Sequence, residues 1–358
     1  MKVSPILLLF CVLITCCKKE SALINDTGAV FNFVTIKADS AIDIGDIYTS
    51  QNFAAFTDLA YYNGLWYTAF RIGTAHAGGE NGQIKILTSA DGYVWKVMDN
   101  IAMKNVDLRG PMLTIDSLSN SLFLTFFSRN VSKNGQVDIK NYITELDKTK
   151  NSWTSFKQVK YDNAIRSQFV FWRYTYHKGK MYCVAYRNPV GIDSVKNLCL
   201  FVNNNNDFLS YKLITNLNLT ATSSETTLRF TEQDSMYIIA RTESINSPIG
   251  ISLPDYKNVS WLYNPLLTIL ASPNFLFYKN KLLITGRDSK QHSFKFFCYN
   301  PALKTVEKVY TFPSGYETGY GGMSFNPHNP DELWVTYYSV TNSGTSIKLA
   351  KINLPAFL

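Results

Sequence analysis

The chain has 358 residues, of which 35 are Lys or Arg and 27 are Asp or Glu, so its formal net charge is +8 at pH 7. The basic residues form no run along the sequence, which argues against a nucleic-acid partner and favours an anionic ligand. The four histidines lack the spacing of a zinc site, and we expect neither a metal nor another cofactor. The 22 Tyr and 23 Phe residues indicate a strand-rich chain.

Residues 1–16 have the pattern of a bacterial signal peptide. The apolar run from Ile6 to Thr15 is too short to cross a bilayer as a helix. Leu13 to Cys16 resembles the lipobox of bacterial lipoproteins, which implies lipidation at Cys16. Lipidation at Cys17 and an ordinary secretory signal are the alternatives. The sequence therefore predicts an exported protein, lipid-anchored to the bacterial cell envelope on the periplasmic or surface side of the outer membrane.

The predicted domain organisation is a signal peptide over 1–16, a polar tether over 17–29 and one β domain over 30–358. About 330 residues in one β domain suit a propeller and are many for most other single cores. We expect a monomer. Three cysteines beyond the N-terminal cluster lie in apolar strands, which favours buried free thiols over disulfides or a metal site: Cys183, Cys199 and Cys298.

The first β-unit runs from Phe56 to Trp95. Its first two strands, Phe56 to Tyr62 and Leu65 to Arg71, flank Asn-Gly, which is the strongest short-range signal of a β-hairpin. A third strand follows at Gln83 to Thr88. Such a unit cannot bury its apolar faces alone and must stack against others.

The second strand of this unit recurs five more times at intervals of about 50 residues, which is typical of a β-propeller. We therefore predict an all-β fold, a six-bladed propeller of four-stranded antiparallel blades. A strand at Phe31 to Ile36 is expected to pair with the last unit and close the ring. The matched positions of the six copies are Trp66, Phe123, Tyr182, Tyr237, Leu283 and Trp334.

The first strand of each unit is expected to line the central channel. A polar or aromatic residue stands where each of these apolar runs begins, and the repetition predicts that six such residues converge on one rim. Polar groups in such a place are costly unless they are paired or bind a ligand. A network of mutually satisfied residues is the alternative. The six residues are Asp58, Arg109, Arg173, Glu225, Asn274 and Tyr320.

The segment from Ser89 to Trp95, SADGYVW, resembles the Asp-box of sialidases, S-x-D-x-G-x-x-W, shortened by one residue. In that family the Asp-box is a structural turn and carries no chemistry. The resemblance implies the sialidase-like six-bladed propeller, here in a divergent bacterial lipoprotein. Sialidases use a Tyr nucleophile polarised by a Glu, an acid/base Asp and three Arg that clamp a carboxylate.

Further matches imply where these residues would lie. The stretch from Ser224 to Arg241 resembles the one that carries the family's Glu and a triad Arg, which would be Glu225 and Arg241. Arg287 resembles the next triad Arg. Tyr320 falls where the nucleophile is expected, and a Tyr hydroxyl needs a nearby base or positive field for this role.

The chain also departs from the family pattern. Arg71 matches an Arg that is followed five residues later by the acid/base Asp, but His76 stands in that place. Histidine is suited to general acid/base work near neutral pH. The F-R-I-P motif of the first inner strand is absent, so one arm of the carboxylate clamp would have to come from Arg109 or Arg173.

Two functions remain open at this point. The first is a glycoside hydrolase for an acidic or anion-bearing glycan, in which Tyr320, Glu225 and His76 are catalytic. Its ligand-binding residues would be Arg71, Arg109, Arg173, Arg241, Arg287, Asp58 and Asn274. The second is a non-catalytic propeller that binds a glycan or a protein at the cell envelope.

Overall fold

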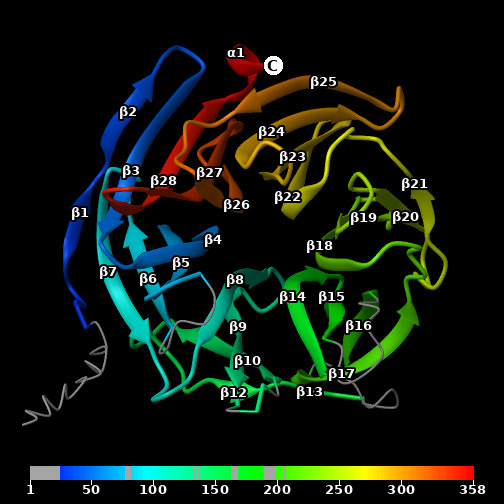
Figure 1. Cartoon of the computed structure of the whole chain (residues 1–358), viewed down its shortest axis with the longest axis horizontal. Helices are drawn as coiled ribbons and strands as arrows, with labels where there is room; N and C mark the ends of the chain where they lie inside the picture. Colours follow the sequence, from blue (N-terminus) through cyan, green and yellow to red (C-terminus); the bar gives the residue numbers. More distant parts are fainter. Residues whose placement is uncertain are drawn as a thin grey trace, which may run out of the picture.

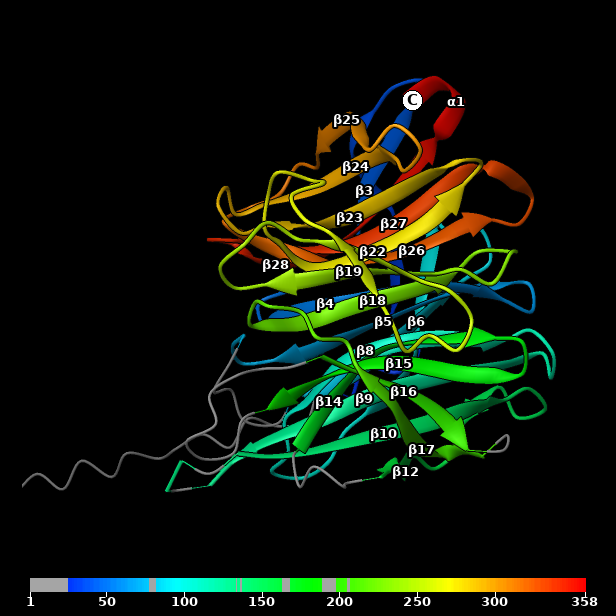
Figure 2. The ribbon, with the colours of Figure 1, turned by 90° about the vertical axis from the view of Figure 1, so that its right-hand side faces the viewer.

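The computed structural model describes residues 25–76, 82–132, 134–135, 137–162, 168–188, 198–204 and 207–358. These residues form six sheets arranged in a ring (Figure 1), with all strand pairs antiparallel except the short β13–β17 pair. The inner strands run roughly along the axis of the ring (Figure 2). The predicted six-bladed all-β propeller is confirmed. The signal peptide, Cys16 and the first part of the tether lie outside the described residues.

The first three blades each begin with a long strand on the inside of the ring. Blade 1 contains β4 (Phe53–Tyr62), β5 (Leu65–Gly73), β6 (Gln83–Ser89), β7 (Val94–Ile101) and the outer strand β1 (Val30–Asn32). Blade 2 contains β8 (Leu108–Asp116), β9 (Ser121–Val131), β10 (Val137–Asp147), β11 (Ser152–Trp153) and β12 (Lys157–Gln158). Blade 3 contains β14 (Gln168–His177), β15 (Lys180–Asn188), β16 (Leu198–Asn204), β17 (Asp207–Asn216) and β13 (Lys160–Tyr161).

The last three blades repeat the arrangement, and a short helix α1 (Leu354–Phe357) follows them. Blade 4 contains β18 (Ser223–Phe230), β19 (Met236–Thr242), β20 (Ile249–Ser252) and β21 (Ser260–Leu262). Blade 5 contains β22 (Leu270–Tyr278), β23 (Lys281–Asp288), β24 (Ser293–Asn300) and β25 (Thr305–Thr311). Blade 6 contains β26 (Glu317–Asn326), β27 (Asn329–Thr341), β28 (Gly344–Asn353), β3 (Ile42–Ser50) and β2 (Val34–Ala38).

The seam of the ring differs from the prediction. The strand that pairs with β28 is β3, while the predicted closing segment is divided between β1 on blade 1 and β2 at the outer edge of blade 6. A strand that pairs with β28 is covered by neighbouring strands and must therefore have apolar side chains to bury. β3 has such side chains, and its Ile44 and Ile47 are fully buried. All five residues of β2 are exposed. Across the seam Trp66 stacks on Trp334 with ring centroids 3.8 Å apart.

The apolar residues gather between the blades. A buried cluster fills each of the six interfaces between neighbouring blades, because every sheet has two faces to cover and each neighbour covers one. Cys183, Cys199 and Cys298 are buried and free, as predicted. Within the described part of the chain, no helix is long and apolar enough to cross a membrane.

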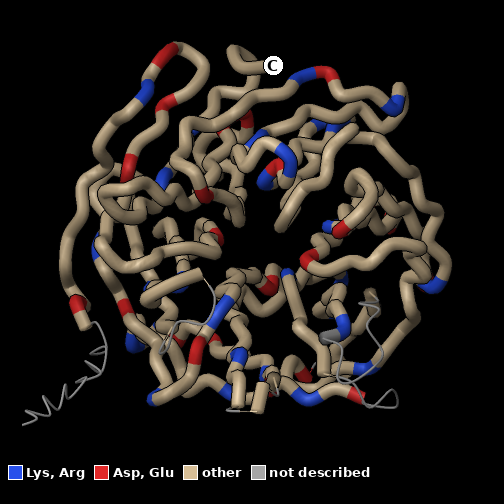
Figure 3. Tube along the Cα trace, viewed as in Figure 1, with Lys and Arg blue, Asp and Glu red and all other residues tan. Residues whose placement is uncertain are grey.

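The described end of the predicted tether contacts blade 1. The backbone N–H of Gly28 donates to the carbonyl of Val97, and Asp26 pairs with the buried Lys85. Basic and acidic residues are interspersed around the ring without a basic stripe (Figure 3).

Candidate active site

A β-bulge interrupts the innermost strand of all six blades near its start, so that two residues oppose one on the next strand. A bulge breaks the strict alternation of a strand and re-aims its side chains. The first inserted residue has a positive φ in four blades, including 62° at Phe56 and 52° at Tyr320. The inserted pairs are Phe56 and Thr57, Gly110 and Pro111, Trp172 and Arg173, Ser224 and Glu225, Ser272 and Pro273, and Tyr320 and Gly321.

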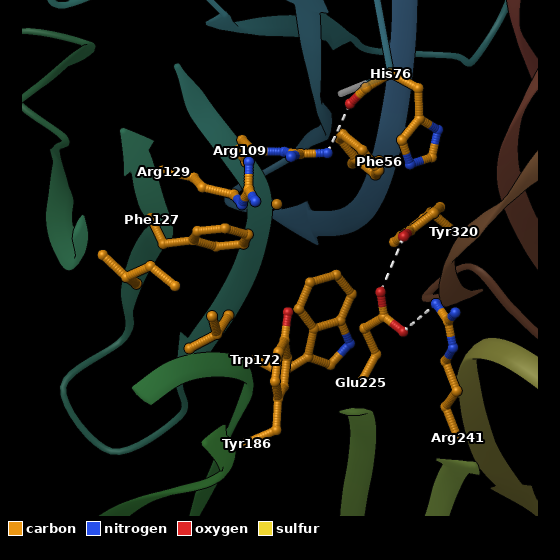
Figure 4. A pocket seen from close by; sticks show the side chains of 13 residues that line it. Phe56, His76, Arg109, Phe127, Arg129, Trp172, Tyr186, Glu225, Arg241 and Tyr320 are labelled. Atoms are coloured by element: carbon orange, nitrogen blue, oxygen red, sulfur yellow. Dashed lines mark hydrogen bonds and ion pairs between the residues drawn. The ribbon is translucent and has the colours of Figure 1, made fainter. Parts of the chain in front are cut away.

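A cavity of about 280 Å³ lies among these bulges (Figure 4). Its described lining comes from blades 1, 2, 3, 4 and 6, with the largest share from blades 2 and 3 and none from blade 5. The lining residues are Phe56, His76, Arg109, Gly110, Phe127, Arg129, Ile139, Val170, Trp172, Tyr186, Glu225, Arg241 and Tyr320.

Tyr320, Glu225 and Arg241 form a connected group on one side of this cavity. The Tyr320 hydroxyl donates to Glu225 Oε1 at 3.0 Å, and Arg241 Nη1 donates to Glu225 Oε2 at 2.6 Å. Arg241 Nη2 also lies 3.6 Å from Glu243 Oε2. Two bulges bring the first two residues together, since Tyr320 is inserted in β26 and Glu225 in β18, and Arg241 lies opposite the β18 bulge.

The pKa values of this group follow from its burial and its charges. Burial alone would raise the pKa of Glu225, but the charge of Arg241 and the hydrogen bonds from Arg241 and Tyr320 outweigh it and lower the pKa. Burial, and next the Glu225 charge, raise the pKa of Tyr320 above its usual 10, against the opposing effect of Arg241. At neutral pH the group is therefore a neutral phenol hydrogen-bonded to an ionised carboxylate.

His76 lies at the rim of the cavity. Its Nδ1 is hydrogen-bonded to Glu317 Oε1, and the same oxygen accepts a hydrogen bond from the Tyr338 hydroxyl at 3.1 Å. Its ring contacts that of Phe56 edge-on, with centroids 5.1 Å apart, and Phe56 in turn contacts Tyr320 at 4.5 Å. The bond through Nδ1 leaves Nε2 as the ring nitrogen for a ligand.

Arg109 and Arg129, both on blade 2, lie on the other side of the cavity in Figure 4. Arg109 Nη2 donates to the carbonyl of His76 at 2.7 Å, its Nε is 3.8 Å from Asp107 Oδ2, and its guanidinium lies over the ring of Phe56. No carboxylate of the described residues forms an ion pair with Arg129. Its guanidinium is therefore a positive group within reach of a ligand.

Arg71, which we predicted to bind the ligand, does not line the cavity. Its side chain is fully buried, with Nε 2.7 Å from Asp107 Oδ1 and Nη1 donating to the carbonyl of Ala75 at 2.9 Å. Asp107 also lies near Arg109. The buried pair of Arg71 and Asp107 therefore links the end of β5, which precedes His76, to the start of blade 2 next to the cavity.

Asp58, Arg173 and Asn274, also predicted ligand residues, belong to a buried polar layer that does not line the cavity. Arg173 Nη1 donates to Asp58 Oδ1 at 2.6 Å, and Asp58 Oδ2 accepts from the backbone N–H of Leu113 at 2.7 Å. Asn274 accepts from Arg229 Nη2 at 3.0 Å. Burial, with repulsion from Arg173, lowers the pKa of Arg229 to about 9. For these three predicted residues the arrangement is a buried polar network, in which Arg173 Nε has no hydrogen-bond partner among the described residues.

Arg287 is the remaining predicted ligand residue, and it too lies outside the cavity. It pairs in the β-ladder with Ala271, before the bulge of β22, whereas Arg241 lies opposite the bulge of β18. The two arginines therefore differ by one residue in register, which reverses the face on which a strand side chain lies. The charge of Arg287 lowers the pKa of Glu317 instead.

Sequence reasoning missed Arg129, Trp172 and Tyr186 as lining residues. A signal for Arg129 was present, since the second strands of several units end in Arg, and only some of these arginines were considered. Trp172 occupies the same bulge position as Phe56 and Tyr320. Nothing in the pattern distinguished Tyr186 from the other strand tyrosines.

Solved structures share this fold. A protein of unknown function from Dyadobacter fermentans matches with a TM-score of 0.74 and 14% identity, over 88% of this chain and 100% of its own. A mutant of Trypanosoma rangeli sialidase with trans-sialidase activity matches with a TM-score of 0.67 and 12% identity, over 94% of this chain and 59% of its own. The NanB sialidase of Streptococcus pneumoniae, as a K499G mutant, gives 0.63 and 9%, over 90% and 71%.

These neighbours establish a sialidase-like propeller fold. Trypanosoma rangeli sialidase has also been solved in complex with sialic acid, at a TM-score of 0.64 and 11% identity over 90% of this chain, which spans 57% of that enzyme's length. No family model and no curated protein matches the sequence.

Proposed function

We propose that the protein is a sialidase-like glycoside hydrolase for a glycan that carries an anionic group. The observation that carries this proposal is the hydrogen bond from the Tyr320 hydroxyl to the ionised Glu225, inside a cavity whose described lining contains three arginines and one carboxylate. A cavity of about 280 Å³ is at the small end of ligand pockets and suits one sugar ring.

In the first step Tyr320 Oη attacks the anomeric carbon while Glu225 takes its proton. Because the pKa of Tyr320 is raised, this proton must move during the attack, since free phenolate is scarce at neutral pH. The bond from the anomeric carbon to the leaving oxygen breaks, and protonated His76 gives that oxygen a proton. In the second step water attacks the anomeric carbon and the bond from that carbon to Tyr320 Oη breaks, while His76 takes a proton from the water and Glu225 returns a proton to Tyr320.

Substitution of Tyr320 by Phe tests this mechanism. Tyr320→Phe removes the nucleophile and retains the ring that packs on Phe56, so we expect turnover to fall on the order of 10⁴-fold or more while ligand affinity stays nearly unchanged. The measurement is mass spectrometry of products from a panel of acidic glycans, with calorimetry for binding. Tyr316→Phe, at an exposed tyrosine, is the matched control. Unchanged turnover in Tyr320→Phe would remove the mechanism.

A non-catalytic glycan-binding propeller is the second candidate. It is favoured by the absence of any lining carboxyl group other than Glu225 among the described residues, so that a His takes the place of the usual acid. This function predicts saturable binding of an acidic glycan with no product, and His76→Ala would leave that binding unchanged. For the hydrolase, His76→Ala lowers turnover by about 10²- to 10⁴-fold.

A further inference from the structure

We propose that the anionic group of the ligand is bound on blade 2 by Arg129 and Arg109, and that the ligand is a sugar whose anionic group is on a carbon other than the anomeric carbon. A hexuronic acid and a sugar 6-sulfate both have this chemistry. The inference rests on the proposed function for the position of the anomeric carbon and deepens it by naming the class of ligand.

The charges around the cavity direct an anion to blade 2. Arg241 is neutralised by Glu225 at 2.6 Å and approached by Glu243 at 3.6 Å. Asp107 makes its short contact, 2.7 Å, with the buried Arg71 and lies 3.8 Å from Arg109. Among the described residues Arg129 has no carboxylate partner. Within the described lining, Arg129 and Arg109 are therefore the arginines whose positive charge is least compensated.

The order of the blades places these arginines across the ring from the proposed nucleophile. Blade 2 is opposite blade 5 in a six-membered ring, and Glu225 and Tyr320 belong to blades 4 and 6, which flank blade 5. Figure 4 shows the same separation, with Arg109 and Arg129 on one side of the cavity and Tyr320, Glu225 and Arg241 on the other. The cavity has no described lining from blade 5 and extends between blades 2 and 3.

This geometry selects among anionic sugars. If Tyr320 attacks the anomeric carbon, a carboxylate on that same carbon would lie beside Tyr320, on the side of the cavity where Arg241 is already paired with Glu225. An anionic group carried across the sugar ring would reach Arg129 and Arg109. Two guanidinium groups suit the two oxygens of a carboxylate or of a sulfate ester, and the aromatic rings of Phe127 and Trp172 line the cavity between blades 2 and 3.

Calorimetry of the full mature chain with four monosaccharides tests the inference: D-glucuronate, D-glucose 6-sulfate, N-acetylneuraminate and D-glucose. We expect glucuronate or glucose 6-sulfate to bind at least about tenfold more tightly than glucose, since hydrogen bonds to a charged group have that strength. The tighter of the two identifies the anionic group. Arg129→Gln should bring its affinity to within about threefold of that for glucose, and Arg129→Lys should lie between. Arg287→Gln, on the unlined blade 5, is the matched control and should keep the preference.

Each other outcome overturns the inference. Tightest binding of N-acetylneuraminate, a preference that survives Arg129→Gln, or a preference that Arg287→Gln abolishes would place the anion elsewhere. Equal binding of all four sugars would show that the cavity does not select an anion. Failure of the proposed function can be distinguished from failure of this inference. If the protein prefers an anionic sugar through Arg129 but forms no product, the binding site stands and only the hydrolase function is contradicted.

Discussion

Glu225 links stability to pH. Its pKa is lowered in the folded protein, so it contributes stability above the ordinary value of 4.5, and this contribution is lost as pH falls through the lower folded value. We expect the wild type to be more stable than Glu225→Gln at pH 7, and the difference to shrink as the pH falls below 4.5. Urea unfolding of both proteins at pH 7 and pH 3.5 measures this. A difference that does not change with pH would contradict the assignment of the ionised carboxylate to Glu225.

Asp58 has a structural role at the centre of the ring. Its side chain is 1% exposed and is the carboxylate that pairs with Arg173. Asp58→Asn would leave the charges of Arg173 and Arg229 buried together, and breaking a buried pair in this way costs about 3–5 kcal/mol. The urea midpoint of unfolding measures the loss. Asp138→Asn, at an exposed pair with Lys140, should change stability by less than about 0.5 kcal/mol. A similarly small effect at Asp58 would show that the buried network is not needed.

At the scale of elements, we expect the closing strand β3 to contribute more to folding than the other strands of the N-terminal segment. A variant that begins at Asp39 loses β1 and β2, of which β2 is exposed along its whole length, and should remain a folded monomer of lower stability. A variant that begins at Gln51 also loses β3 and leaves β28 as an open edge with its apolar neighbours uncovered. We expect it to aggregate. Size-exclusion chromatography and thermal unfolding distinguish the two, and a folded monomer from the shorter variant would contradict this account of the seam.

Repetition made the blades predictable, whereas the bulges were not. Trp66 and Trp334, matched in the sequence as copies of one strand, stack on each other across the seam. The bulges leave no mark in the apolar pattern, yet each one shifts the register by a residue. Arg241 lies opposite the bulge of its blade and lines the cavity, whereas Arg287 pairs with the residue before the bulge of its blade and does not line the cavity. The sequence predicted five residues that do line the cavity, Tyr320, Glu225, Arg241, His76 and Arg109. It predicted five others that do not, because buried pairs and the register of a strand relative to its bulge cannot be read from the apolar pattern.

At the scale of the whole molecule, the fold constrains the sequence less strictly than the site does. Sequence identities of 9–14% to the structural neighbours accompany TM-scores from 0.62 to 0.74. Blade interfaces need only apolar side chains of suitable volume, which many sequences supply. The site needs particular groups at particular positions, and there the chain lacks the F-R-I-P motif of the first inner strand and has His76 where the sialidase pattern implies an Asp.

Attachment to a membrane through Cys16 is the prediction that belongs to the whole molecule. The first 16 residues have a short apolar run that leads into the lipobox-like segment at Leu13 to Cys16. A diacylated cysteine would therefore be the anchor, since two chains give stable membrane binding where one gives only marginal binding. Expression in a bacterium that carries out lipoprotein processing should place the wild type in the membrane fraction and label it with radioactive palmitate.

Cys16→Ser should remove the label and release a soluble propeller, while Cys17→Ser retains both label and membrane. This pair of variants separates lipidation at Cys16 from its alternatives. Release by Cys17→Ser alone would move the anchor by one residue, and a membrane-bound, unlabelled Cys16→Ser protein would mean that some other part of the chain attaches it. Sugar binding by the released propeller should equal that of the wild type, because all the described residues that line the cavity lie beyond Phe53.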